Sequence, residues 1–383
     1  MPRRATIFKQ IRESNDRVLT VDAGDLLGWR SDVRRYETLM TAVSRLSYDA
    51  VGIGDNDFVD GAQFLGGGIR KHVLPVTSAN VRPALPEGDL TYPPFIIVPK
   101  DALRIGVIGL ATPQSFRFIS PRRRSEINIA DQARALQQVL ASVRKQSDLI
   151  VLLHHADMDA SIEIARKFSD IDLIIGSHDQ TVHKAPVREG QTLIVHTGRN
   201  GAYVGHLTLT LNKGHIDQFE NRLIPLTDEI ADEPIVKGVI EAYYAALRQA
   251  VEQTALLTLD GPFQGADTCI PCHEKAASQW RETPHARAFQ SLIDDNKQDH
   301  PECLGCHTTG YGQPGGYRNV QATNHLTSVQ CEVCHRVAVT HLQKPQNTAG
   351  TVKKVSEGLC VTCHTSVQSP DFHYEEALER VRH

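Results

Sequence analysis

The chain has 383 residues, and its 41 lysines and arginines nearly balance 45 aspartates and glutamates, so the formal net charge is −4 at pH 7. This length allows two or three domains, and the small negative charge argues against a nucleic-acid or anionic-membrane partner. No apolar stretch approaches the roughly 18 residues that a membrane-spanning helix needs, so no membrane span is expected.

The cysteines divide the chain. Residues 1–226 contain none of the eight cysteines, whereas residues 263–383 contain all of them. Between these parts, residues 228–258 carry apolar side chains at helical spacing, which predicts a connecting helix. The sequence therefore predicts a first domain at residues 1–226, a helical linker at 227–262 and a second domain at 263–383.

In the first domain, short apolar runs alternate with helical stretches. The runs are predicted strands, and they lie at residues 17–25, 46–54, 105–110, 148–153, 171–175, 192–196 and 203–211. This alternation predicts an α/β sandwich. Several runs end in candidate metal-binding side chains: Asp25, the stretch Asp55-Asn56-Asp57, the pair His154-His155, and His178. Open α/β sheets place their sites at the C-terminal ends of strands, so a metal site is expected there.

The order Asp22-Ala-Gly-Asp25, Gly54-x-x-Asp57-Phe58, a histidine at a strand end, and Gly176-x-His178 resembles metallophosphoesterases of the 5′-nucleotidase (calcineurin-like) type. The resemblance covers about residues 1–212, and the thiosulfohydrolases of sulfur oxidation belong to the same group. It implies a four-layer αββα sandwich with two divalent metals that activate water against a phosphoryl group. It also implies that Asp25 is a bridging ligand, that His155 and His178 are histidine ligands, and that Asp55 replaces an asparagine ligand.

The sequence departs from this family at three places. Asn56 replaces the phosphate-facing histidine, and an amide supplies neither a proton nor a positive charge at neutral pH. Gln180 replaces the last histidine ligand, and no first Asp-x-His pair is present. Three hypotheses stay open for this domain: an inactive scaffold, one weakly bound divalent metal, or an active hydrolase completed by residues outside this numbering. His154 is expected to be a hydrogen-bonded core residue.

The second domain repeats the pattern Cys-x-x-Cys-His, which is the attachment signature of c-type haem. The four copies use every cysteine in the chain: Cys269, Cys272 and His273; Cys303, Cys306 and His307; Cys331, Cys334 and His335; Cys360, Cys363 and His364. Zinc sites would not need a histidine after every cysteine pair, and cysteines so close in sequence make poor disulfide staples. The sequence therefore predicts four covalent haems, each with the motif histidine as its proximal iron ligand.

The distal ligands are expected to be histidines or absent, because the chain's three methionines all lie outside the second domain. Haems without methionine ligation have low reduction potentials. Trp280-x₄-His285 and Cys331-Glu-x-Cys-His335-x₅-His341 resemble multihaem cytochromes of the cytochrome c-554 type over about residues 265–375. The resemblance implies a small, mostly helical and irregular domain with closely stacked haems, in which His285 and His341 are distal ligands.

A few features of the second domain stand outside that resemblance or depart from it. His325 is a further distal candidate, whereas three other histidines are expected to be exposed: His300, His373 and His383. Arg336 follows the third motif, where the family usually has Gly-Pro.

The chain is thus expected to be a periplasmic or extracellular electron carrier with redox protein partners, its leader missing from this numbering because no apolar segment follows the first arginines. The alternatives are an active phosphoesterase, 5′-nucleotidase or sulfur-compound hydrolase fused to a cytochrome, and a subunit of a homo-oligomeric or filamentous cytochrome assembly. Whether the first domain is an enzyme stays open.

Overall fold

The computed structural model describes residues 1–28, 32–84, 92–178, 181–198, 200–212, 214–256, 263–335, 337, 339–349, 354–365 and 368–383. The chain divides into two compact units, Met1–Glu241 and Ala242–His383. Helix α7 (Pro234–Leu256) contains the division and coincides with the predicted connecting helix. The boundaries drawn at 226 and 263 stay predictions. No described helix is long and apolar enough to span a membrane.

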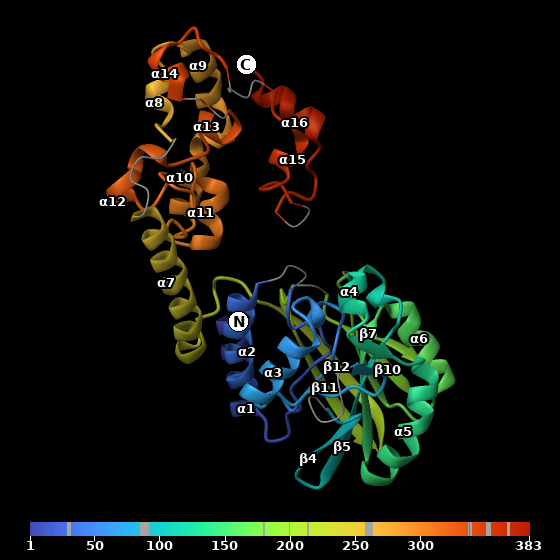
Figure 1. Cartoon of the computed structure of the whole chain (residues 1–383). Coiled ribbons are helices and arrows are strands. Elements are labelled where there is room, and N and C mark those ends of the chain that lie inside the picture. Colours follow the sequence, from blue (N-terminus) through green and yellow to red (C-terminus); the bar gives the residue numbers. More distant parts are fainter. Residues whose placement is uncertain are drawn as a thin grey trace. The chain divides into compact units, whose positions relative to one another are not determined.

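A six-stranded sheet with the order β4-β5-β7-β8-β10-β9 forms the centre of the first unit (Figure 1). Neighbouring strands among β5, β7, β8 and β10 are parallel, and the edge strands β4 and β9 are antiparallel to their neighbours. The strands are β4 (Phe95–Lys100), β5 (Leu103–Ala111), β7 (Leu149–Ala156), β8 (Leu173–His178), β9 (Val187–Glu189) and β10 (Thr192–His196).

The two faces of this sheet bury different layers, because successive side chains of a strand point to opposite sides. In β7, Ile150 and Leu152 pack with the helices α5 (Gln132–Gln146) and α6 (Met158–Lys167). Leu153 points the other way, into a core that includes Ala23, Ala50 and side chains of the hairpin β11 (Tyr203–Asn212) and β12 (His215–Pro225). Every residue of β7 is buried.

The parallel pair β1 (Val21–Asp22) and β2 (Ala50–Val51) forms the second β layer together with the hairpin, and three helices pack against this pair. They are α1 (Pro2–Ser14), α2 (Val33–Ser44) and α3 (Ala62–His72), and their apolar faces share one core with Val51 and Ile53. The unit is thus the predicted four-layer αββα sandwich. Its remaining elements are η1 (Asn56–Phe58), β3 (Val81–Pro83), η2 (Ser115–Phe118), α4 (Pro121–Arg124) and β6 (Ile127–Ile129).

The second unit consists of short helices joined by irregular segments (Figure 1). Its hydrophobic cluster is small and contains Phe289, Leu292, Leu304, Tyr317 and Leu326. So few buried apolar side chains agree with a domain whose core is completed by prosthetic groups. After α7, its helices are α8 (Ala266–Cys269), α9 (Glu274–Glu282), η3 (Pro284–Arg287), α10 (Ala288–Asp294), α11 (Pro301–His307), α12 (Val320–Thr323), η4 (Asn324–Leu326), α13 (Cys331–Cys334), α14 (Val339–Gln343), α15 (Glu357–Cys360) and α16 (Tyr374–Val381).

Candidate functional site

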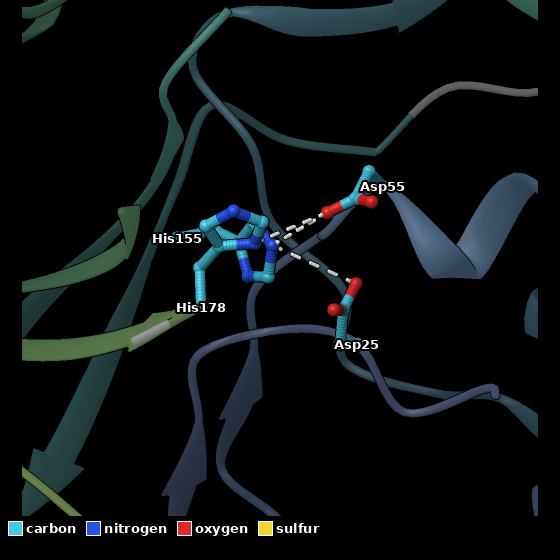
Figure 2. Close-up of side chains that lie close together, drawn as sticks. All are labelled: Asp25, Asp55, His155 and His178. Carbon is cyan, nitrogen blue, oxygen red and sulfur yellow. Dashed lines mark hydrogen bonds and ion pairs between the residues drawn. The ribbon is translucent and has the colours of Figure 1, made fainter. Parts of the chain in front are cut away.

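Four side chains that the sequence singled out meet at the C-terminal ends of strands in the first unit. Asp25 and Asp55 follow β1 and β2, whereas His155 and His178 lie at the ends of β7 and β8. One ligand atom of each residue lies within 4.8 Å of the others (Figure 2). Two imidazoles and two carboxylates at this separation are a donor set that suits a divalent transition-metal cation.

Asp55 is the centre of the contacts within this cluster. Its Oδ1 lies 3.0 Å from His155 Nε2 and 3.4 Å from His178 Nδ1. His155 Nε2 is also 3.6 Å from Asp25 Oδ1, and Figure 2 shows both imidazoles directed at the carboxylates. Burial opposes ionisation of Asp55, but the hydrogen bonds and charges of His155 and His178 outweigh it and lower its pKa to about 2. The cluster thus holds a carboxylate in the form that binds metals.

The backbone around the cluster is held in rare conformations. Asp25 has φ +60° and His178 has φ +67°, which are left-handed values that non-glycine residues seldom adopt. Such outliers concentrate at functional sites. Gly54 approaches so closely that a Cβ there would lie 2.1 Å from Asp25 Oδ1 and 2.6 Å from His155 Cε1. Only glycine therefore fits at this point of the site.

The neighbours of the cluster fix the orientation of its ligands. Asp57 is buried, and its carboxylate accepts hydrogen bonds from the backbone N–H groups of Asp25, Leu27 and Gly54 at 2.9–3.1 Å. His155 Nδ1 lies 2.8 Å from Ser177 Oγ, which donates to the Ala23 carbonyl. The loops that carry Asp25 and Asp55 are thus tied together by groups that do not themselves belong to the cluster.

Two further predictions concern residues beside the cluster. Asn56 donates to both oxygens of Asp25, from its backbone N at 2.9 Å and from its Nδ2 at 2.6 Å. His154 is buried between Ser161 Oγ and Gln132 Oε1, so it is the hydrogen-bonded core residue that was expected. Gln180, the predicted replacement for a histidine ligand, lies outside the described residues.

The four Cys-x-x-Cys-His motifs lie on short helices of the second unit. They occupy α8, α11, α13 and α15 and the residues that follow each helix. All eight cysteines are described, and none forms a disulfide. The thiols of Cys269 and Cys331 are hydrogen-bond neighbours, as are those of Cys306 and Cys363, and in each pair the contact raises the pKa of the first-named thiol. The first motif therefore lies beside the third, and the second beside the fourth.

Three of the four motif histidines face a second imidazole. The ring centroids are 6.1 Å apart for His273 and His341, 6.0 Å for His285 and His364, and 5.5 Å for His335 and His383. Two imidazoles on opposite sides of one metal, each with a metal–nitrogen bond of about 2 Å, have centroids about 6 Å apart. The centroid distances of these three pairs are close to the separation that two histidine ligands of one iron would have.

The fourth motif histidine has different surroundings. His307 Nδ1 lies 2.7 Å from the Ala288 carbonyl oxygen and 3.2 Å from Ser291 Oγ, which orients the ring. Among the described residues, no second imidazole is in ring contact with it. His325, the further distal candidate, lies beside the backbone of Gly265. Among the described residues, no ring contact joins it to a motif histidine. The departure at Arg336 lies outside the described residues.

His383 lies beside a motif histidine although the sequence did not single it out as a distal candidate. It was expected to be an exposed histidine, and its residue is indeed exposed, yet its ring lies against His335. It follows α16, whose apolar side chains are half-buried. The only signal in the sequence was this short amphipathic stretch, which places the end of the chain on the domain surface.

Comparisons with known proteins divide the chain in the same way. The family described as "Cytochrome c554 and c-prime" matches residues 268–336. Cytochrome c-554 of Nitrosomonas europaea is 30% identical over 135 residues, which cover 31% of this chain and 57% of that protein. A 5′-nucleotidase of Diplobatis ommata is 26% identical over 270 residues, which cover 64% of this chain and 46% of that protein.

A solved structure gives the fold of the first unit independently. The 5′-nucleotidase precursor of Thermus thermophilus superposes with a TM-score of 0.57 at 24% identity, over 66% of this chain and 54% of its own. The chain thus spans about half the length of the relatives it matches. It combines a metallophosphoesterase-like fold with a c-type cytochrome domain, as the two resemblances predicted, and that domain implies covalent haem.

Proposed function

We propose that this protein is an extracytoplasmic tetrahaem cytochrome that transfers electrons, with the metallophosphoesterase-like domain as a scaffold or docking module. The observation that carries the proposal is the set of three imidazole pairs at 5.5–6.1 Å, one at each of three attachment motifs. Haem attached at the motifs would supply one-electron redox chemistry. Covalent attachment of haem normally takes place outside the cytoplasm, which is why a periplasmic or extracellular location is proposed.

The residues of the chain suit low-potential electron transfer. Six imidazoles would hold the irons of three haems, and no methionine lies in the second domain to raise a potential. The thiol of Cys269 lies beside that of Cys331, and the thiol of Cys306 lies beside that of Cys363. The attachment sites are therefore close together in pairs. All three imidazole pairs lie within one chain, so the proposal needs no ligand from a second copy and does not require a filament.

The test is iron content combined with a redox titration of the purified full chain. We expect four covalently bound irons per chain, low midpoint potentials and reversible reduction of every haem. Fewer than four irons would contradict the tetrahaem assignment. Four haems that fail to exchange electrons reversibly would contradict the function.

In the first domain, the four-ligand cluster supports binding of one divalent cation without hydrolysis. Asn56 stands beside the cluster and binds Asp25 through both its N–H groups, and it has no group that protonates a leaving oxygen. We expect one cation per chain and no turnover of phosphodiesters or nucleotides. Two stoichiometric cations together with hydrolysis would establish the fused-hydrolase alternative instead.

A second candidate function is ligand binding at the second motif, favoured by the surroundings of His307. Its imidazole is oriented by the Ala288 carbonyl, and within the described part of the chain no other imidazole faces it. A haem iron that only His307 held would be able to bind a small ligand. We expect carbon monoxide to bind one haem of four in the reduced protein, and binding to none would contradict this candidate.

A further inference from the structure

Glu332 is a buried acidic residue inside a haem attachment motif. It lies between Cys331 and Cys334, and 9% of its surface is exposed. Acidic residues are almost never buried without partners, because removal of a charge from water is costly. The three other motifs have Ile270, Leu304 and Val361 at the same position, so the shared chemistry of attachment does not require a carboxylate there.

The partners of Glu332 lie just before the first motif. Its two carboxylate oxygens accept hydrogen bonds from the Gln264 N–H at 2.8 and 3.0 Å and from the Gly265 N–H at 2.8 Å. Gln330 adds a parallel contact, since its Oε1 accepts from the Ala266 N–H at 2.5 Å. The segment that leads into the first motif is therefore held by side chains on both sides of Cys331.

The backbone of that segment is shaped to make these contacts. Gly265 has φ +82°, and a Cβ there would lie 2.9 Å from the His325 carbonyl oxygen. Glycine is therefore required at the point where the N–H groups of residues 264 and 265 converge on one carboxylate. Successive N–H groups that point to one centre form an anion-binding concavity.

Within the described part of the chain, backbone N–H dipoles surround the Glu332 carboxylate. Every contact described for the carboxylate is with a backbone donor, which is the environment of the ionised form. No lysine or arginine among the described residues pairs with it. Glu332 directly follows Cys331, and Gly265, which donates to its carboxylate, has its carbonyl oxygen 3.9 Å from Cys269 Sγ. A carboxylate that no described lysine or arginine pairs with thus lies beside two attachment sites.

We propose that Glu332 is a positioning residue that clamps the first haem attachment site to the third and lowers the reduction potential of both haems by its charge. The inference rests on the tetrahaem function proposed above. A nearby negative charge stabilises the oxidised iron, which carries one more positive charge than the reduced iron. Two of the four haems would therefore have lower reduction potentials than the other two.

The test compares Glu332→Gln with Glu332→Asp in the full haem-loaded chain. The glutamine variant keeps the size of the side chain but removes its charge, and the aspartate variant keeps the charge. A matched control is Glu302→Gln, because Glu302 is equally close in sequence to an attachment cysteine but is exposed. Redox titration followed by optical and EPR spectra would count the haems that shift.

We expect E332Q to shift two of the four haem potentials to more positive values, while E332D and E302Q keep the wild-type potentials. Unchanged potentials in E332Q, or an equal shift of all four, would overturn the proposal, as would an E332D shift as large as that of E332Q. Amide hydrogen exchange of the wild-type holoprotein tests the clamp itself. The Gln264 and Gly265 amides should exchange slowly, and rapid exchange would refute the clamp even if a variant loses haem.

Different results would contradict the tetrahaem function and the role of Glu332. Fewer than four irons in the wild-type protein would contradict the tetrahaem function before any variant is made. Four reversibly reduced haems with no effect of E332Q would leave that function standing and remove only the role of Glu332.

Discussion

Asp57 orients the loops that carry the four candidate metal ligands but is not one of these ligands. The substitution Asp57→Asn should therefore weaken both the fold and cation binding. Its Oδ2 accepts from Gly54 at 2.9 Å and from Asp25 at 3.1 Å, and its Oδ1 accepts from Leu27 at 3.1 Å. An asparagine has one acceptor oxygen, so its amide group must face at least one of these N–H donors. A buried donor left without a partner costs about 1–3 kcal/mol.

The expected loss of stability is therefore about 1–3 kcal/mol if the amide oxygen takes the position of Oδ2, and more in the opposite orientation. Loosening the loops of Asp25 and Asp55 should also lower cation affinity by roughly 10- to 100-fold, as loss of a ligand-orienting group typically does. Burial raises the pKa of Asp57 to about 7, so the comparison belongs at pH 8, where the carboxylate form prevails.

Two measurements on the full chain would check this prediction. Native-state hydrogen exchange of β1, β2 and β7 gives the free energy of opening in the first domain, and calorimetric titration with Mn²⁺ or Zn²⁺ gives the affinity. Asp217→Asn, at an exposed position of β12, is the matched control. If D57N stays within about 0.5 kcal/mol of the wild type, the usual range for surface substitutions, and binds the cation equally well, the reasoning is refuted.

Three further predictions follow from single residues. Burial lowers the pKa of His154 to about 3, so between pH 6.5 and 3 the unfolded chain binds a proton that the folded chain does not. Stability of the first domain should therefore fall by about 1.4 kcal/mol per pH unit on acidification from this group, and His154→Gln should remove that slope in calorimetry. His155→Ala should abolish cation retention after dialysis, measured by elemental analysis, and an unchanged metal content would contradict the cluster. His383→Ala should convert one low-spin haem to high spin in the EPR spectrum without loss of iron, whereas His373→Ala should leave the spectrum unchanged.

The strands and the cluster could be predicted because both depend on local sequence. Alternating apolar runs indicate strands, and a polar residue that directly follows a strand lies at the sheet edge. Asp25, Asp55, His155 and His178 each have that position, and the structure brings all four together. The Asp57 clamp could not be foreseen, because it depends on where the loops of Asp25 and Gly54 meet in space.

In the haem domain, the attachment motifs could be predicted from the sequence, but the histidines on the other side of each haem could not. Attachment motifs are contiguous, so the cysteines and motif histidines are evident from sequence alone. A distal histidine can come from any part of the chain that reaches the other face of the haem. His325 and His383 are both isolated histidines, yet only His383 lies against a motif histidine. That difference arises from the packing of α16 and not from spacing along the sequence.

Asn56 orients one ligand of the candidate metal site through two hydrogen bonds. Its two N–H groups hold both oxygens of Asp25, so the ligand is oriented even without a cation. The same position would need an imidazole to donate a proton to a leaving oxygen. Each carboxylate oxygen has a further lone pair, so Asp25 keeps its capacity to bind a metal. The amide of Asn56 therefore orients the Asp25 carboxylate, which is one of the four candidate metal ligands.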